Sequence, residues 1–194
     1  MGKIEANKER KRRDILIAAQ EVFLSEGYVS ASMDKIAAQA QMTKQTVYRY
    51  FPSKVDLFQA TLRQMGQGLD DSFLVHLQNP DSREALLGFA ESFIRFHLSD
   101  EHIATFRLLV SESAKAPEIT SIFLSAGPDD TEAKLSAFFS ERFNVEEARS
   151  LVLLWTGMLL SLRSGVLVGM QKPGMQQIND HAREATDFLL AAIS

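Results

Sequence analysis

Apolar residues recur every three or four positions along most of the chain, which is the spacing of an amphipathic α-helix. A helix is predicted over residues 8–26, and its apolar positions are Ile15, Ala18, Ala19, Val22 and Phe23. Gly27 follows in the position expected of a C-cap. Neither a strand-like alternation nor an internal repeat is found, so we expect an all-α protein.

Two short helices are predicted next, over residues 33–40 and 44–50. Ser32 and Thr43 stand in front of them as N-caps. A turn this tight requires a positive φ, so we expect Gln41 to adopt one at a cost of about 1 kcal/mol. The segment therefore predicts a helix-turn-helix.

The outward residues of the second short helix are polar or aromatic: Lys44, Gln45, Thr46, Tyr48, Arg49 and Tyr50. Amides and cations on such a helix can read base edges in the major groove of DNA, while hydroxyls hold phosphates. The alternative is a helical hairpin that only packs, but packing alone would not require so polar and aromatic an outer face.

Some fifty residues match, in order and spacing, the DNA-binding segment of one family. The matching positions are Ile15, Ala18, Ala19, Phe23, Gly27, Tyr28, Met33, Ile36, Ala37, Ala40, Met42, Thr43, Lys44, Thr46, Val47, Tyr48, Tyr50, Phe51, Lys54, Leu57 and Phe58. The pattern resembles the TetR family of bacterial transcriptional regulators, although that family usually has Gly where this chain has Gln41. Residues 106–128 resemble, more weakly, the C-terminal domain of its AcrR/AefR-like subgroup.

The resemblance implies roles for individual residues. Base-reading positions of the family match Lys44, Gln45 and Tyr48. Positions near the phosphates match Ser32, Thr43, Tyr50 and Lys54.

Only helices are predicted after residue 52. Their ranges are 53–77, 82–98, 99–110, 119–124, 131–143, 145–170 and 175–192. Ser53 with Asp56 forms a capping box for the first of them, and Gly66 and Gly68 weaken its far end. Asn144 with Glu147 is predicted to form a capping box at the start of the helix over residues 145–170. We expect a helix-turn-helix DNA-binding domain over residues 1–52 and a helical bundle for ligand binding and dimerisation over residues 53–194 (about nine helices).

Charge is distributed unevenly. The net charge is −4, yet residues 1–63 contain eleven Lys and Arg against seven Asp and Glu, and the remainder contains ten against eighteen. A basic end on an acidic body is typical of a DNA reader with a second, non-DNA domain, unless the asymmetry arises by chance. Lys11, Arg12 and Arg13 could reach phosphates, either directly or as an arm in the minor groove, or belong to a solvated tail.

Residues 151–169 are apolar enough to suggest a membrane span. Arg163 near the middle of this stretch, and the charged residues before it, argue against that reading, so we expect no membrane. The charged N-terminal stretch lacks the apolar segment of a signal peptide, so we expect a cytoplasmic protein.

In proteins like TetR the second domain encloses an apolar ligand pocket. Candidate wall residues are Phe89, Phe93, Phe96, His97, Phe106, Leu109, Trp155, Met158 and Leu159, and each could equally be plain core.

Small residues recur at near four-residue spacing in the helix over residues 145–170, and the last helix carries one apolar face. Candidate dimer residues are Gly157, Ser161, Ser164, Gly165, Ala182, Ala185, Phe188 and Leu189. The resemblance implies a homodimer built as a four-helix bundle, whereas the spacing alone also fits packing within one chain.

Catalytic and metal-binding patterns are not found in the sequence. There is no Cys, and His97 and His102 lie five positions apart rather than four. We therefore expect no enzyme, no metal and no cofactor. The leading hypothesis is a dimeric repressor that binds a near-palindromic DNA operator and is released by an apolar small molecule. The alternatives are a regulator controlled by a protein partner or by no effector, and a helical carrier or enzyme with a vestigial helix-turn-helix.

Overall fold

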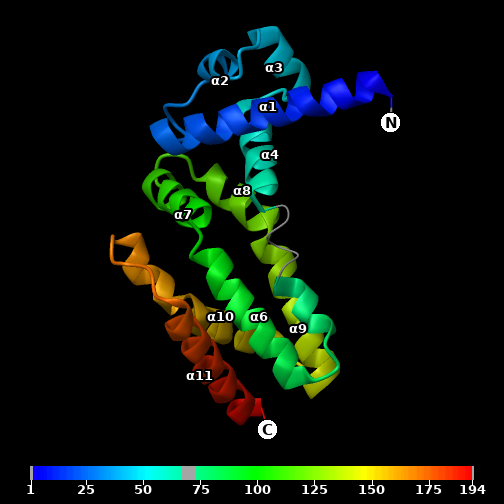
Figure 1. Ribbon diagram of the computed structural model, residues 1–194, viewed down its shortest axis with the longest axis vertical. Coiled ribbons are helices and arrows are strands. Elements are labelled where there is room, and N and C mark those ends of the chain that lie inside the picture. Colours follow the sequence, from blue (N-terminus) through cyan, green and yellow to red (C-terminus); the bar gives the residue numbers. More distant parts are fainter. Residues whose placement is uncertain (1, 67–72, 194) are drawn as a thin grey trace. The chain divides into compact units, whose positions relative to one another are not determined.

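The computed structural model describes residues 2–66 and 73–193, and all regular structure in them is helical (Figure 1). These residues form ten α-helices and one 3-10 helix: α1 (Lys3–Glu26), α2 (Met33–Gln39), α3 (Lys44–Tyr50), α4 (Lys54–Gly66), η1 (Val75–Gln78), α6 (Ser82–His97), α7 (Asp100–Glu112), α8 (Glu118–Ala126), α9 (Pro128–Phe143), α10 (Ala148–Leu167) and α11 (Met175–Ile193). The predicted all-α class is confirmed.

The chain forms two compact units that do not follow chain order. The first combines Met1–Gly66 with Ala104–Ala126, and the second combines Gln67–Ile103 with Gly127–Ser194. The division falls within α7. The predicted boundary between residues 52 and 53 divides the chain by function, into a DNA-binding and a ligand-binding domain. It stays a prediction, because the compact units are defined by packing alone.

The first unit is built on the apolar stripe of α1, against which α2 and α4 pack. Phe23, Tyr28 and Phe58 form an aromatic cluster at its centre, with ring centroids 4.8–5.9 Å apart. Residues from α7 and α8 complete this core: Leu108, Leu109, Ile119 and Ile122, with Ala116 between the two helices. A three-helix head of about fifty residues has only a small apolar core, and α4, α7 and α8 add further apolar contacts to it.

The second unit encloses a core rich in aromatic side chains. Phe89 lies between Phe73 and Trp155, with ring centroids 5.4 and 5.5 Å away. Phe139 of α9 meets Trp155 edge-on at 6.0 Å. Helices α6, α10 and α11 pack together around these rings, and α9 packs on α10. Each ring buries a large apolar area, so this cluster supplies much of the stability of the unit.

Local capping motifs place most helix ends where the sequence predicts them. Asp56 N–H donates to the Ser53 hydroxyl (3.1 Å) at the start of α4, as the capping box requires. Helix α1 begins five residues earlier than predicted, at Lys3. Helix α9 begins at Pro128, because proline is well suited to a first helical turn.

Two further boundaries differ from the predictions. Helix α4 is described as far as Gly66, and its predicted continuation over residues 67–72, with Gly68, lies outside the described residues. Residues 75–78 form a 3-10 turn where the sequence predicts an α-helix as far as residue 77. Asn144 does not cap the start of α10. It adopts a left-handed conformation (φ 53°) that ends α9, which Asn tolerates better than most residues, and α10 begins at Ala148.

Candidate DNA-binding surface

The two short helices are capped by their own side chains. Lys35 N–H donates to the Ser32 hydroxyl and Thr46 N–H to the Thr43 hydroxyl, each across 3.3 Å. Both N-caps are as predicted, and they satisfy amides that the first turn of a helix leaves without partners.

The turn between α2 and α3 has the predicted left-handed residue. Gln41 adopts φ 54°, one of two non-glycine residues with positive φ among those described. The amide of Met42 donates back to the carbonyl of Ala37 (2.9 Å), which closes the turn. Gln41 is exposed, so its side chain has room in this conformation.

Helix α3 has one buried residue, Val47, which packs with Ile36 and Ala37 of α2. All the other side chains of α3 reach the surface to some degree. The predicted base-reading residues Lys44, Gln45 and Tyr48 are exposed, and Tyr48 has 40% of its surface accessible. The helix therefore presents an amide, a cation and a phenol on a face that no other part of the first unit covers.

Lys44 is held by an acidic neighbour. Its ammonium lies 2.8 Å from the Asp34 carboxylate, and 5.9 Å from the centre of the Tyr48 ring. The hydrogen bond to Asp34 raises the pKa of Lys44. Both partners are exposed, so the pair is readily exchanged for another anion.

Of the predicted phosphate-binding residues, Tyr50 lies at the C-terminal end of α3, where the Arg49 guanidinium approaches its ring to 5.8 Å. Ser32 and Thr43 are the N-caps, so their hydroxyls already accept a backbone hydrogen bond. The Thr43 hydroxyl also shares a hydrogen bond with the Thr46 hydroxyl (2.9 Å). A phosphate would have to receive the hydroxyl proton of either residue.

Lys54 differs from the exposed cation that the resemblance implies. Its ammonium donates to the carbonyls of Tyr28 (2.8 Å), Val29 (3.2 Å) and Ala31 (3.1 Å), and lies 4.5 Å from the Tyr28 ring centre. All three donors of the ammonium are thus used inside the protein, where they fix the loop between α1 and α2. A phosphate contact by Lys54 would have to replace one of these bonds.

The same loop is fixed from α7. The Glu112 carboxylate accepts a hydrogen bond from the Val29 amide (2.8 Å), and Glu112 is 8% exposed. A Cβ at Gly27 would approach this carboxylate to 3.1 Å, and the φ of Gly27 is +84°. The sequence gives no signal for the contact, because the two residues lie 83 positions apart.

The candidate pocket residues fall into two separate cores. Seven belong to the second unit, and they are Phe89, Phe93, Phe96, His97, Trp155, Met158 and Leu159. Phe106 and Leu109 pack with the core of the first unit instead. Helical spacing predicts that a residue is buried but not which core it joins, and the role of these nine residues as a pocket wall stays a prediction.

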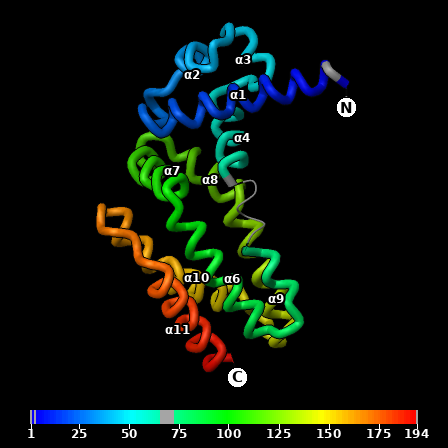
Figure 2. Tube along the Cα trace, in the orientation of Figure 1, coloured from blue at the N-terminus to red at the C-terminus, as the bar shows by residue number. Residues whose placement is uncertain are grey.

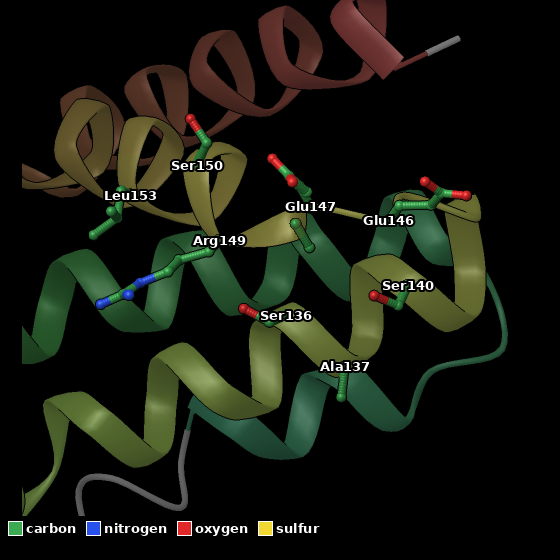
Figure 3. A pocket seen from close by; sticks show the side chains of 9 residues that line it. Ser136, Ala137, Ser140, Glu146, Glu147, Arg149, Ser150 and Leu153 are labelled. Atoms are coloured by element: carbon green, nitrogen blue, oxygen red, sulfur yellow. The ribbon is translucent and has the colours of Figure 1, made fainter.

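One hollow among the described residues lies along α9 and the start of α10 (Figure 3). It has a volume of about 710 Å³ and is lined by Ser136, Ala137, Ser140, Glu146, Glu147, Ala148, Arg149, Ser150 and Leu153. None of the nine candidate pocket residues is among them. Its serine, glutamate and arginine side chains make it a polar surface groove, unlike an apolar pocket.

Two histidines and an arginine gather at the edge of the second core. The rings of His97 and His102 lie 4.4 Å apart, and His97 donates its Nδ1 proton to the Phe93 carbonyl (2.8 Å). Burial, together with the positive charge of Arg163, lowers the pKa of His102 to about 4, and burial lowers that of His97 well below its usual value. No group of three His, Cys, Asp or Glu side chains able to hold a metal ion occurs in residues 2–66 and 73–193.

The candidate dimer residues divide by exposure. Gly157, Ser161, Ser164 and Phe188 are exposed, and Gly165 is half-buried. Ala182, Ala185 and Leu189 are buried in the core of their own unit, which is the alternative that the spacing allowed.

Helix α10 is long and apolar enough to cross a membrane, as judged by length and composition alone. Core helices of soluble proteins pass the same test, and 22% of the apolar window of α10 is buried.

Comparison with known proteins agrees with this geometry. Residues 15–61 match the family of bacterial regulatory proteins described as the tetR family, and residues 84–145 match the C-terminal domain of AefR-like transcriptional repressors. The transcriptional activator FasR of Mycolicibacterium smegmatis is 36% identical over 90 residues, which is 46% of this chain and 41% of FasR. The repressor BepR of Brucella suis is 34% identical over 62 residues, 32% of this chain and 30% of BepR. The chain thus spans less than half the length of these two relatives.

Solved structures match over nearly the whole chain. The flavonoid-responsive regulator FrrA superposes with a TM-score of 0.80 at 25% identity, covering 95% of this chain and 97% of that one. A TetR-family regulator from Mesorhizobium loti has a TM-score of 0.79 at 23% identity, covering 95% and 96%, and so shows the fold.

A helix-turn-helix followed by a helical bundle is the architecture of a DNA-binding transcriptional regulator, a class distinct from enzymes. The chain belongs to the TetR family, as the resemblance predicts. The contact between Glu112 and Val29 also shows that the segment matching the AefR-like domain reaches into the unit that carries the helix-turn-helix.

Proposed function

We propose that this protein is a dimeric repressor that binds a near-palindromic operator through α3 and leaves it when an apolar small molecule binds. The single observation that carries the proposal is the exposed flank of α3, where the side chains of Lys44, Gln45 and Tyr48 are solvent-exposed and Val47 is the buried residue. Its DNA target implies a cytoplasmic location.

Each base-reading residue has a chemical reason for its role. The amide of Gln45 can pair with both the acceptor and the donor that adenine presents in the major groove, and the Lys44 ammonium can donate to guanine. Lys44 would exchange Asp34 for a base edge or a phosphate, and a phosphate would also restore its charge pairing. Tyr50, Ser32 and Thr43 would donate to phosphates on either side.

A second subunit fits the exposed stripe of α10 and α11. Leu154 and Phe188 are 65% and 68% exposed, and Gly157 and Ser161 lie one and two turns beyond Leu154. His181 joins the two helices, with Nε2 2.8 Å from the Met158 carbonyl and 3.2 Å from the Ser161 hydroxyl. Large apolar side chains beside small residues favour close helix packing between two copies, which would place two α3 helices in successive major grooves roughly 34–36 Å apart.

An apolar effector would act on the second unit, whose core contains most of the candidate pocket residues. FrrA is described as flavonoid-responsive, and a planar aromatic ligand would suit rings such as Phe93 and Phe96. A coupling free energy of about 1–3 kcal/mol between effector and operator would be enough to switch binding.

Selection of bound duplexes from random DNA tests the proposal, first without and then with a panel of aromatic compounds. The wild-type protein should enrich one near-palindrome. Gln45→Ala should relax the preference at one position of each half-site and cost about 1–3 kcal/mol there. Gln171→Ala, which removes an exposed glutamine of the second unit, is the matched control and should leave the preference intact. An unchanged preference in Gln45→Ala would contradict the assignment.

A further inference from the structure

The first turns of α1 are a basic helix rather than a frayed tail. Helix α1 begins at Lys3, so Lys8, Lys11 and Arg12 have defined positions on its surface. They are spaced at i, i+3 and i+4, and the same spacing leads on to Ile15 and Ala19. The three cations therefore extend the face with which α1 packs into the core of the first unit.

The first unit covers this face only in part before residue 15. Figures 1 and 2 show the N-terminal turns of α1 projecting beyond α2, α3 and α4. Lys8 and Arg12 are exposed, Lys11 is half-buried, and the apolar Ile4 on the same side is 86% exposed. A face that is apolar within the core and cationic beyond it is suited to an anionic partner.

This cationic face lies beside the C-terminal end of α3. The Arg12 guanidinium lies 5.5 Å from the ring centre of Phe51, which caps the C-terminus of α3. Arg49 and Tyr50 are the last residues of the same helix. When a helix of this length enters the major groove, its ends lie near the two phosphate backbones that bound the groove, which is about 12 Å wide.

The opposite face of the same turns also carries cations, Arg10 and Arg13, but it does not lead on to the buried Ile15 as the first face does. Arg10 donates to the Asn7 side chain (2.8 Å), so part of its hydrogen-bonding capacity is already used. Arg13 lies on this outer side, where Asp14 follows it. The basic segment thus has two faces of similar charge, of which one adjoins α3.

We propose that Lys8, Lys11 and Arg12 form a second DNA contact, which binds the phosphate backbone beside the groove that α3 enters. This inference rests on the proposed function, because it assumes that α3 binds DNA. The site reads no bases: it adds affinity and salt dependence, and it holds the register of α3 from outside the helix-turn-helix.

Two double variants, each of which loses two positive charges, distinguish a phosphate contact at this site from a non-specific attraction between the basic segment and DNA. Lys8→Gln with Lys11→Gln removes two cations from the face beside α3, whereas Arg10→Gln with Arg13→Gln removes two from the outer face. Glutamine has nearly the helix propensity of lysine and arginine, so α1 should persist in both, which circular dichroism would verify. Binding to the selected operator is measured between 50 and 200 mM salt.

The first variant should make the slope of log affinity against log salt less steep by about 1.8 for each DNA-binding domain of the dimer. It loses two phosphate contacts, and each contact contributes about 0.9. Its preference among sequences should not change. The outer-face variant should lower the slope by much less. Equal slopes for the two variants, or an unchanged slope in the first, would overturn the site. Wild-type protein that enriched no sequence would instead refute the proposed function.

Discussion

The Glu112 carboxylate accepts a hydrogen bond from the amide of Val29, 83 positions earlier in the chain. Lys54 holds the carbonyl of the same Val29. The loop before the helix-turn-helix is therefore bonded on one side by the helix that follows α3 and on the other by α7. Its geometry depends on residues that lie outside the DNA-binding motif.

Replacing Glu112 by alanine should lower the free energy of unfolding by roughly 1–3 kcal/mol, because the half-buried Val29 amide loses its acceptor. Glu112→Gln keeps a carbonyl oxygen and should recover most of this loss. Urea unfolding followed by circular dichroism measures both. Lys115→Ala is the control, because the Lys115 ammonium is exposed and lies 3.5 Å from Glu112, so this long ion pair should contribute less than about 1 kcal/mol. A larger effect of Lys115→Ala than of Glu112→Ala would contradict this account.

Glycine at position 41 should stabilise the protein. Gln41 is strained at φ 54°, whereas glycine adopts that angle freely, so Gln41→Gly should gain on the order of 0.5–1 kcal/mol after the added entropy of the unfolded chain is subtracted. The same change at Ala38, exposed within α2, should cost about 1 kcal/mol. Thermal unfolding of the two variants side by side tests the opposite signs, and a loss of stability in Gln41→Gly would refute the strain.

Acid should destabilise the second unit through His102. Its pKa is lowered from 6.5 to about 4 in the folded protein, so between these values the unfolded chain binds the proton more readily. The free energy of unfolding should then fall as pH drops from about 6.5 to 4, by on the order of 3 kcal/mol for this group, and the group should contribute nothing above pH 6.5.

His102→Gln should flatten that dependence, and chemical unfolding at a series of pH values would measure it. Folded-state burial of His97 acts in the same direction, so some slope should remain. Parallel curves for the variant and the wild type would show that His102 is not the responsible group.

The exposed stripe of α10 gives a prediction about assembly. Leu154→Glu should shift the protein toward monomer without unfolding it, because a charge in a dimer interface is costly while Leu154 is 65% exposed in the single chain. Val110→Glu on α7 has the same starting exposure of 65% and should leave the assembly unchanged. Sedimentation at micromolar concentration distinguishes the two, and a monomeric wild type would remove the proposed interface.

Features determined by neighbouring residues could be predicted from the sequence. The caps at Ser32 and Thr43 and the positive φ of Gln41 follow from a few adjacent positions, and the structure has all three. Asn144 was misread because the same residue type can cap a helix start or end a helix in the left-handed conformation. The choice depends on the two helices that it joins.

Features that depend on tertiary packing could not be predicted. The partners of Lys54 and the acceptor role of Glu112 require knowledge of which segments meet in space. Phe106 and Leu109 have the spacing of buried residues, as Phe89 and Phe93 do, yet they belong to another core. Periodicity specifies the buried side of a helix, and the identity of its neighbours comes from the whole fold.

Trp155 is the only tryptophan in the chain, and it is fully buried between Phe89 and Phe139 in the second unit. Intrinsic fluorescence excited at the indole band consequently reports on that unit alone, with no engineered label. Tryptophan emission would follow the second unit, and the fluorescence anisotropy of a labelled operator duplex would follow DNA binding by the first. Recording both signals in one titration would show which of them changes first when a compound is added.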